Sequence, residues 1–158
     1  MKAEVSFVRM DLSPNGIFVK HRIKRFCSVL FLTYLLTVIY LTLFTFNYYV
    51  YGKSVNLVMF DSIRLMLRSH SPMLILKNIL GNVLLFFPYG FFLPLFFKRF
   101  RSFSQLLGIG FLSSLLIESC QYEFAQRIFD VDDLMLNTVG AILGWIVFKI
   151  VKWVSVKF

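Results

Sequence analysis

FCSVLFLTYLLTVIYLTLFTF, residues 26–46, carries no charged side chain and is the strongest indication of the fold class of this chain. A helix needs about 20 apolar residues to cross a hydrocarbon core of about 30 Å. The basic segment KHRIKR, residues 20–25, precedes the run, as in a signal peptide. The run is longer than a signal core and no small-x-small cleavage site follows it, so we expect a retained transmembrane helix. The aromatic segment NYYVY, residues 47–51, suits the opposite membrane interface.

The composition extends this interpretation to the whole chain. The 158 residues are 58% hydrophobic and have a mean hydropathy of +0.75. These values are typical of an integral membrane protein, and the chain is too short for a second domain. The net charge of +9 comes from basic residues that cluster beside apolar runs, a pattern of cytoplasmic loops, so no nucleic-acid partner is expected. Cys27 and Cys120 form no CxxC pair and His70 stands alone, so no metal site or cofactor is expected.

Three more apolar stretches follow, at residues 79–97, from Phe103 to Ile117 with a continuation into Glu118 and Gln121, and from Leu134 to Val154. Pro88 and Pro94 should kink the first of them. Between the first and second spans, NLVMFDSIRLMLRSH, residues 56–70, is interpreted as a short amphipathic helix in the interface or as a loop packed on the bundle.

The predicted fold is therefore an all-α membrane protein with four transmembrane helices and a short interfacial amphipathic segment. Residues 1–25 form a cytoplasmic N-terminal segment and residues 26–158 a four-helix transmembrane domain. In this topology the basic segments at 20–25 and 98–101 and the terminal lysines fall on one side of the membrane, as the positive-inside rule expects of the cytoplasmic side. Lys77 and two arginines fall on the other side and weaken the agreement with this rule slightly. We expect a multi-pass protein of a bacterial plasma membrane with both termini cytoplasmic.

Polar side chains form a stripe at the outer end of three predicted helices. The stripes contain Asn78 and Asn82, then Glu118 and Gln121, then Asp133, Asn137, Gly140 and Gly144. Residues three or four apart share one face of a helix. A buried amide or carboxylate is costly in lipid unless it has a partner. We therefore expect the stripes to face one another around an outward-open polar pocket, while the glycines allow a second helix to approach closely.

The loop between the third and fourth spans supplies further charges. Arg127 is the available counter-charge for Glu118, Asp130 or Asp133, and its guanidinium suits a carboxylate or a phosphate. The loop is short enough to fold Arg127 back over the helix ends.

These residues carry a resemblance to a known family. The pattern N-x-x-x-x-x-P-x-G at Asn82, followed by E-x-x-Q at Glu118 and R-x-x-D-x-x-D-x-x-x-N-x-x-G at Arg127, resembles the VanZ-like family over roughly residues 27–150. The NLxxF segment at Asn56 also resembles that family, whereas Asp132 is outside the pattern and receives a lesser role. VanZ-like proteins are small bacterial membrane proteins, and the namesake is associated with resistance to teicoplanin, a lipidated glycopeptide that binds cell-wall precursors. The resemblance implies a similar role without a settled biochemical activity.

Several functions fit the predicted pocket. The residues expected to bind a ligand are Asn78, Asn82, Glu118, Gln121, Arg127, Asp130, Asp133 and Asn137. The expected partners are membrane lipids, together with a lipoglycopeptide or a lipid-linked cell-wall precursor. One alternative is a membrane enzyme that modifies such a precursor with Glu118, Asp130 or Asp133, with the two aspartates able to hold a divalent cation. Others are an accessory subunit of an envelope complex and a purely structural clasp between helices. The oligomeric state stays open.

Overall fold

The computed structural model describes residues 14–44, 54–125 and 127–157, and nearly all of its ordered elements are helices. Within these residues, four helical segments are long and apolar enough to cross a membrane. They are Arg22–Leu43, Pro72–Phe96, Phe103–Phe124 and Val131–Ser155. The predicted all-α membrane fold with four spans is confirmed.

The first helix, α1 (Pro14–Leu43), begins well before the predicted boundary at Phe26. Proline suits the first turn of a helix, because its fixed φ is helical and its missing N–H would have no partner there. The basic segment at residues 20–25 is therefore the helical continuation of the span, so the helix runs without a break across the predicted segment boundary. The aromatic segment at residues 47–51, expected at the far interface, lies outside the described residues.

The second span also begins earlier than the sequence predicted. It consists of α3 (Pro72–Leu74), a π-helical segment η1 (Ile75–Leu80) and α4 (Gly81–Phe96), which follow one another directly. α4 contains both Pro88 and Pro94, and it ends where the Arg101 side chain donates from Nε to the Pro94 carbonyl at 3.2 Å. A basic side chain that binds the last carbonyl groups is a common way to end a helix.

A short 3₁₀ turn, η2 (Lys98–Arg101), leads into α5 (Phe103–Phe124). The last span is α6 (Val131–Lys157), which starts three residues before the predicted Leu134. Its first turn therefore contains Asp132 and Asp133, and negative charge is favourable near the N-terminus of a helix.

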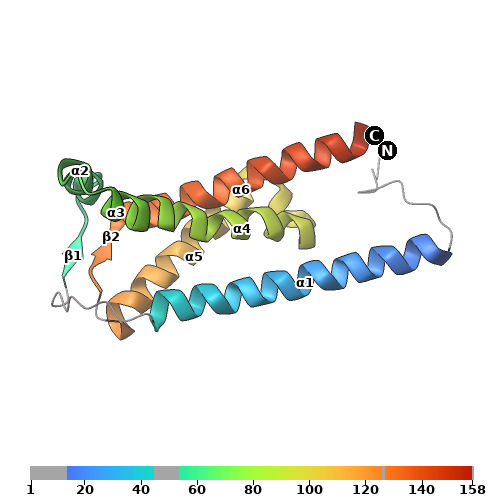
Figure 1. Cartoon of the computed structure of the whole chain (residues 1–158), viewed down its shortest axis with the longest axis horizontal. Coiled ribbons are helices and arrows are strands. Elements are labelled where there is room, and N and C mark those ends of the chain that lie inside the picture. The colour runs from blue at the N-terminus through green and yellow to red at the C-terminus, as the bar shows by residue number, and fades with distance from the viewer. Residues whose placement is uncertain (1–13, 45–53, 126, 158) are drawn as a thin grey trace.

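α4 and α6 pack most closely, and glycines make the approach possible (Figure 1). A Cβ atom on Gly140 would overlap the backbone of Val83, and one on Gly144 would overlap the backbone of Phe87. Gly90 contributes from the opposite helix, because its Cβ would overlap the backbone of Ala141. The predicted role of the glycines on α6 is confirmed, and small residues in membrane helices commonly serve this purpose.

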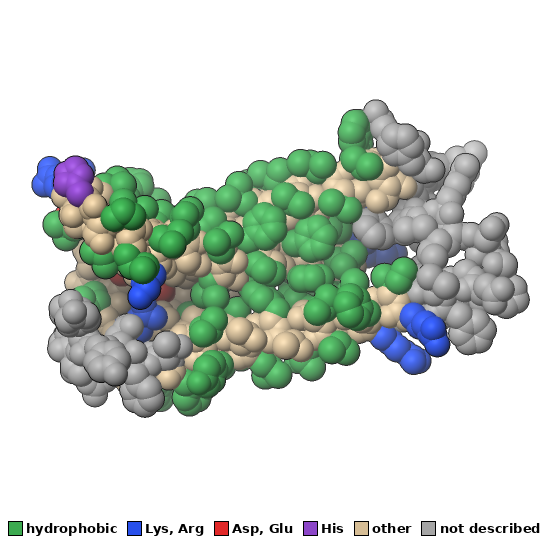
Figure 2. All heavy atoms as spheres, viewed as in Figure 1, with side chains coloured by type: hydrophobic (Ala, Val, Ile, Leu, Met, Phe, Trp, Pro, Cys, Tyr) green, Lys and Arg blue, Asp and Glu red, His purple; other side chains and the backbone are tan. Residues whose placement is uncertain are grey.

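α1 lies along the outside of this core and is attached to it by few polar contacts (Figure 1). The Tyr34 hydroxyl donates to the Leu85 carbonyl at 2.6 Å, and the Gln121 amide donates to the Thr42 carbonyl at 3.1 Å. Val38 and Thr42 are buried, whereas most large apolar side chains of α1 are exposed. Figure 2 shows hydrophobic side chains along the middle of this face of the bundle, as expected for a surface in contact with lipid.

The two ends of the bundle differ in their composition. The start of α1, the turn between α4 and α5, and the end of α6 lie at one end (Figure 1). Arg101 in this turn lies within electrostatic range of Lys152 near the end of α6, so the two like charges are close in space. The basic clusters predicted to be cytoplasmic therefore share one end of the molecule. Which side of the membrane that end faces stays a prediction.

The opposite end carries α2 and a small parallel pairing of strands (Figure 1). β1 (Val55–Asn56) pairs with β2 (Phe129–Asp130), with Val55 beside Phe129 and Asn56 beside Asp130. α2 (Asp61–Arg68) follows β1, so a helix is present in the segment where the sequence allowed a helix or a loop. The strand pairing was not predicted, and it joins the loop after α1 to the start of α6.

Candidate functional site

Polar side chains of three spans and one loop meet around a single cavity of about 270 Å³. The cavity lies at the end of the bundle that carries α2, away from the basic termini. Seven of the eight residues predicted to bind a ligand line it, namely Asn78, Asn82, Glu118, Gln121, Arg127, Asp133 and Asn137. The stripes that the sequence placed on separate helices are thus brought together by the fold.

Asn137 forms the inner wall of the cavity. Its side chain is 2% exposed, and its Nδ2 donates to the Ser114 hydroxyl at 3.0 Å. Ser114 in turn donates to the Leu134 carbonyl at 3.4 Å. The Oδ1 atom of Asn137 is buried and has no hydrogen-bond partner in the structure. An unsatisfied buried acceptor costs about 1–3 kcal/mol, and a donor that reached this atom would remove that cost.

Two carboxyl groups lie beside this wall. Glu118 is 3% exposed and lies within electrostatic range of Asp133 and Arg127. Asp133 accepts a hydrogen bond from Asn82 Nδ2 at 2.6 Å, which joins the start of α6 to α4. Two neighbouring carboxyl groups repel one another when both are ionised, and Arg127 offsets this repulsion for both of them.

Arg127 reaches the cavity because α5 ends beneath it. The backbone N–H groups of Ala125 and Arg127 both donate to the Gln121 carbonyl, at 3.0 and 3.2 Å. These bonds turn the chain at the end of α5 and carry Arg127 back over the helix ends, as the short loop predicted. The Gln121 side chain lies beneath and holds α1 through Thr42.

Asp130 is the predicted site residue that the structure does not bring to the cavity. Its carboxylate accepts hydrogen bonds from the Ser62 hydroxyl, from Asn56 Nδ2 at 3.4 Å and from the backbone N–H of Asp132 at 2.9 Å. These bonds attach β1 and α2 to the start of α6. Asp130 therefore has a structural role, because its oxygens bind Asn56 of β1 and Ser62 of α2.

Asp132 has a larger structural part than the sequence assigned to it. It is 1% exposed, and its two carboxylate oxygens accept the backbone N–H groups of Phe60 at 2.6 Å and Ile63 at 3.2 Å. It thereby caps the N-terminus of α2, where the residues of the helix itself offer no side-chain cap. An acidic residue at the start of one helix gave no signal that it would cap another helix.

The sequence also missed several residues that line the cavity. Lys77 lies at its exposed side, and Leu41, Leu85 and Ile117 supply apolar wall. Lys77 had been noted only as an exception to the distribution of basic loops. Its position directly before Asn78 and four residues before Gly81, in the same helical span, is the signal that places it beside the polar stripes.

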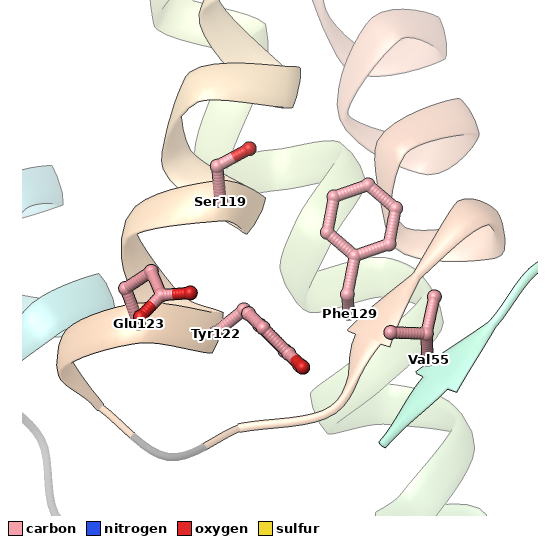
Figure 3. Close-up of a pocket in the computed structure, with 5 residues that line it drawn as sticks. All are labelled: Val55, Ser119, Tyr122, Glu123 and Phe129. Carbon is pink, nitrogen blue, oxygen red and sulfur yellow. The ribbon is translucent and has the colours of Figure 1, made fainter. Parts of the chain in front are cut away.

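A second cavity of about 340 Å³ lies on another face of α5 (Figure 3). Ser119, Tyr122 and Glu123 approach it from α5, Phe129 from β2 and Val55 from β1. None of the predicted ligand-binding residues lines it, so the polar stripes and this cavity are separate features.

Comparison with known proteins agrees with the pattern of these residues. The family described as VanZ/LLP1 matches residues 31–152, which is most of the chain. The chain belongs to the VanZ/LLP1 family. This family is linked to teicoplanin resistance, and the matched region contains every residue that lines the polar cavity.

One relative gives this assignment a second support. Protein VanZ of Enterococcus faecium is 30% identical over 117 residues, which cover 70% of this chain and 66% of that protein. The match thus spans somewhat less than two thirds of the relative. No solved structure matches this chain significantly.

The described residues offer no evident metal centre. Among them, no group of three or more His, Cys, Asp or Glu side chains is arranged to hold a metal ion. Asp130 and Asp133, which the enzyme alternative paired around a cation, direct their oxygens to Ser62 and Asn82 respectively. The cavity chemistry therefore rests on carboxyl, amide and basic side chains.

Proposed function

We propose that this chain supports resistance to lipoglycopeptide antibiotics such as teicoplanin through the polar cavity, which faces outward and binds an amphiphile or a lipid-linked ligand. In this proposal the protein lies in a bacterial plasma membrane with both termini in the cytoplasm. The observation that carries it is the meeting of Glu118, Asn137 and Arg127 around one cavity at the end opposite the basic clusters. The positive-inside rule makes that end the outer one.

The size of the cavity favours a lipid headgroup over the antibiotic itself. Pockets that enclose drug-sized molecules measure about 300–1,000 Å³. A cavity of about 270 Å³ is at the lower limit of this range, and a lipidated glycopeptide is larger than a typical drug. The cavity can hold the polar end of a membrane amphiphile, so protection would act through the membrane or through a lipid-linked precursor.

The energetic cost of the cluster supports a ligand more than a structural clasp. Polar contacts between membrane helices contribute about 0.6 kcal/mol on average. Placing one Asp at the centre of a membrane helix costs about 2.5–3.5 kcal/mol on insertion scales. Glu118, with Asp133 beside it, is buried near an unpartnered amide oxygen of Asn137. A clasp gains little from such an arrangement, whereas a binding site requires it.

One observation keeps an enzyme as a second candidate. Glu118 and Asp133 line the same cavity and interact electrostatically, so one could act as an acid while the other acts as a base toward a bound precursor. The third carboxylate of that hypothesis, Asp130, does not line the cavity, and its oxygens accept hydrogen bonds from Ser62 and Asn56.

The test compares resistance with membrane abundance in a susceptible strain that expresses the chain. Glu118→Gln and Arg127→Lys conserve size while they change the charge or the planar contact. Both variants should lose teicoplanin resistance while their abundance in the membrane stays normal. Glu123→Gln, an exposed carboxylate on the same helix, is the matched control and should keep full resistance.

Two outcomes would count against the proposal. Full resistance in both cavity variants would show that the cavity plays no part in protection. A parallel loss of abundance and resistance would instead indicate that the polar residues only hold the helices together. Catalysis by Glu118 predicts a further distinction, because Glu118→Gln should then bind the precursor and leave it chemically unchanged.

A further inference from the structure

We infer, on the basis of the proposed function, that the cavity takes a zwitterionic phospholipid headgroup in which a phosphate and a primary ammonium are joined by a short linker, as in phosphatidylethanolamine. The inference concerns the chemical class of the ligand. It follows from the distribution of donors, acceptors and charges along the depth of the cavity.

The inner part of the cavity needs donors from its ligand. Four amide side chains line the cavity, and each already donates one hydrogen bond within the protein, with Asn78 bound to the Leu74 carbonyl. Asn82 donates to Asp133, Asn137 donates to Ser114, and Gln121 donates to the Thr42 carbonyl. Acceptors remain, above all the Oδ1 of Asn137, a buried atom without a hydrogen-bond partner on a residue that lines the cavity.

A primary ammonium satisfies this inner part in both geometry and charge. It carries three N–H donors and no acceptor. The Asn137 oxygen and the carboxyl groups of Glu118 and Asp133 supply three acceptors around one space. An anion placed at this depth would face two carboxyl groups and an amide oxygen, all of which would repel it.

The outer part of the cavity has the opposite character. Arg127 and Lys77 line it, and both are more exposed than Glu118 and Asn137. A guanidinium and an ammonium are the two side chains that bind phosphate most readily. Arg127 lines the cavity within electrostatic range of Glu118 and Asp133, so a phosphate in the outer part of the cavity can also meet its guanidinium. Two cations above two carboxyl groups match a ligand with one anionic and one cationic end.

The apolar part of the cavity wall indicates where the acyl chains of the lipid would lie. Leu41 on α1 and Leu85 on α4 line the same cavity as the polar groups. α1 is attached to the core by few polar contacts, and its outer face consists of exposed apolar side chains. A headgroup in the cavity can therefore keep its acyl chains in the bilayer beside α1, because the volume of about 270 Å³ encloses the headgroup alone.

The experiment measures lipid binding to the full chain, purified and delipidated in detergent, by native mass spectrometry. The probes are phosphatidylethanolamine, phosphatidylcholine and phosphatidylglycerol with identical acyl chains. Phosphatidylcholine keeps the phosphate but has no N–H donor, and phosphatidylglycerol keeps the phosphate but has no ammonium. Phosphatidylethanolamine should bind roughly tenfold more tightly than either, the effect of about one charge-assisted hydrogen bond.

Two variants assign this preference to the cavity. Arg127→Gln, in the loop and outside the helical core, should weaken binding of all three lipids because it removes a phosphate contact. Asn137→Leu should remove the preference for phosphatidylethanolamine and leave the phosphate contact in place. Ser119→Ala, which changes a hydroxyl on another face of α5, is the control and should bind as the parent chain does.

Equal binding of the three lipids would overturn the inference, and so would a preference for phosphatidylethanolamine that survives in Asn137→Leu. Tighter binding of soluble O-phosphoethanolamine than of the lipid would assign the cavity to a soluble ligand and would also overturn it. Because no antibiotic is present, the measurement is separate from the resistance assay. If the chain shows no lipid preference but confers resistance, the headgroup inference fails and the proposed function stands. If the chain shows the lipid preference but confers no resistance, the proposed function fails.

Discussion

The carboxylate of Asp132, in the first turn of α6, accepts the backbone N–H of Phe60 at 2.6 Å, although 72 positions separate the two residues. Phe60 has a φ of 64°, a left-handed conformation that costs a non-glycine residue about 1–2 kcal/mol. The bond to Asp132 holds Phe60 in this conformation and starts α2 at the next residue. The start of α2 is thus positioned by α6, the same helix that supplies Asp133 and Asn137 to the cavity.

Removal of this cap should destabilise the protein. Asp132→Ala leaves the N–H groups of Phe60 and Ile63 without partners, so we expect a loss of about 2 kcal/mol or more. Asp132→Asn keeps one acceptor oxygen and should lose about half as much. The measurement is thermal unfolding in detergent together with hydrogen exchange of α2. As a control, Asp61→Ala removes a carboxylate from the first turn of α2 itself and should cost at most about 1 kcal/mol.

The sequence predicted the parts of this architecture that depend on local pattern. Four apolar stretches identified the four spans, and helical spacing placed Asn82, Glu118 and Asn137 on inward faces. The reason is physical, since lipid penalises a polar side chain at any other orientation. The glycines of α6 were recognised in the same way, from their register with Asn137.

The partners of Asp130 and Asp132 could not be predicted in this way. Their hydrogen bonds go to Asn56, Phe60 and Ser62, and no periodic pattern relates a loop to a helix start so far along the chain. The starts of the first two spans were missed for another reason. Hydropathy marks where lipid contact begins, whereas Pro72 marks where the backbone of the second span becomes helical.

The close crossing of α4 and α6 leads to a second prediction. Gly140→Ala would force its Cβ into the backbone of Val83, which cannot move without separating the two helices. We expect a loss of about 1–3 kcal/mol or a loss of membrane abundance. Gly108→Ala is the matched control, because a Cβ at this position meets nothing within 4 Å. It should be neutral or should stabilise the protein by up to about 1 kcal/mol. Equal effects of the two substitutions on unfolding temperature would contradict the observed crossing.

The attachment of α1 leads to a third prediction. Tyr34→Phe removes the hydroxyl that binds the Leu85 carbonyl, and each polar contact between membrane helices contributes about 0.6 kcal/mol. We expect a small loss of global stability but a clear increase in hydrogen exchange along α1. Thr37→Val is the control, since the Thr37 hydroxyl binds only within its own helix, to Thr33. If both variants exchange alike, α1 is held by apolar packing instead.

The orientation of the bundle leads to the last prediction. Positive residues favour the cytoplasmic side, so the end with η2 should face the cytoplasm and the end with α2 should face outward. Single cysteines report this directly in a background with Cys27 and Cys120 replaced by serine. Ser69→Cys, exposed beside α2, should react in intact cells with a maleimide that does not cross membranes. Ser104→Cys, exposed at the start of α5, should react only after the membrane is opened. The reverse pattern would place the cavity on the cytoplasmic side, where it could not act on antibiotics that bind outside the membrane.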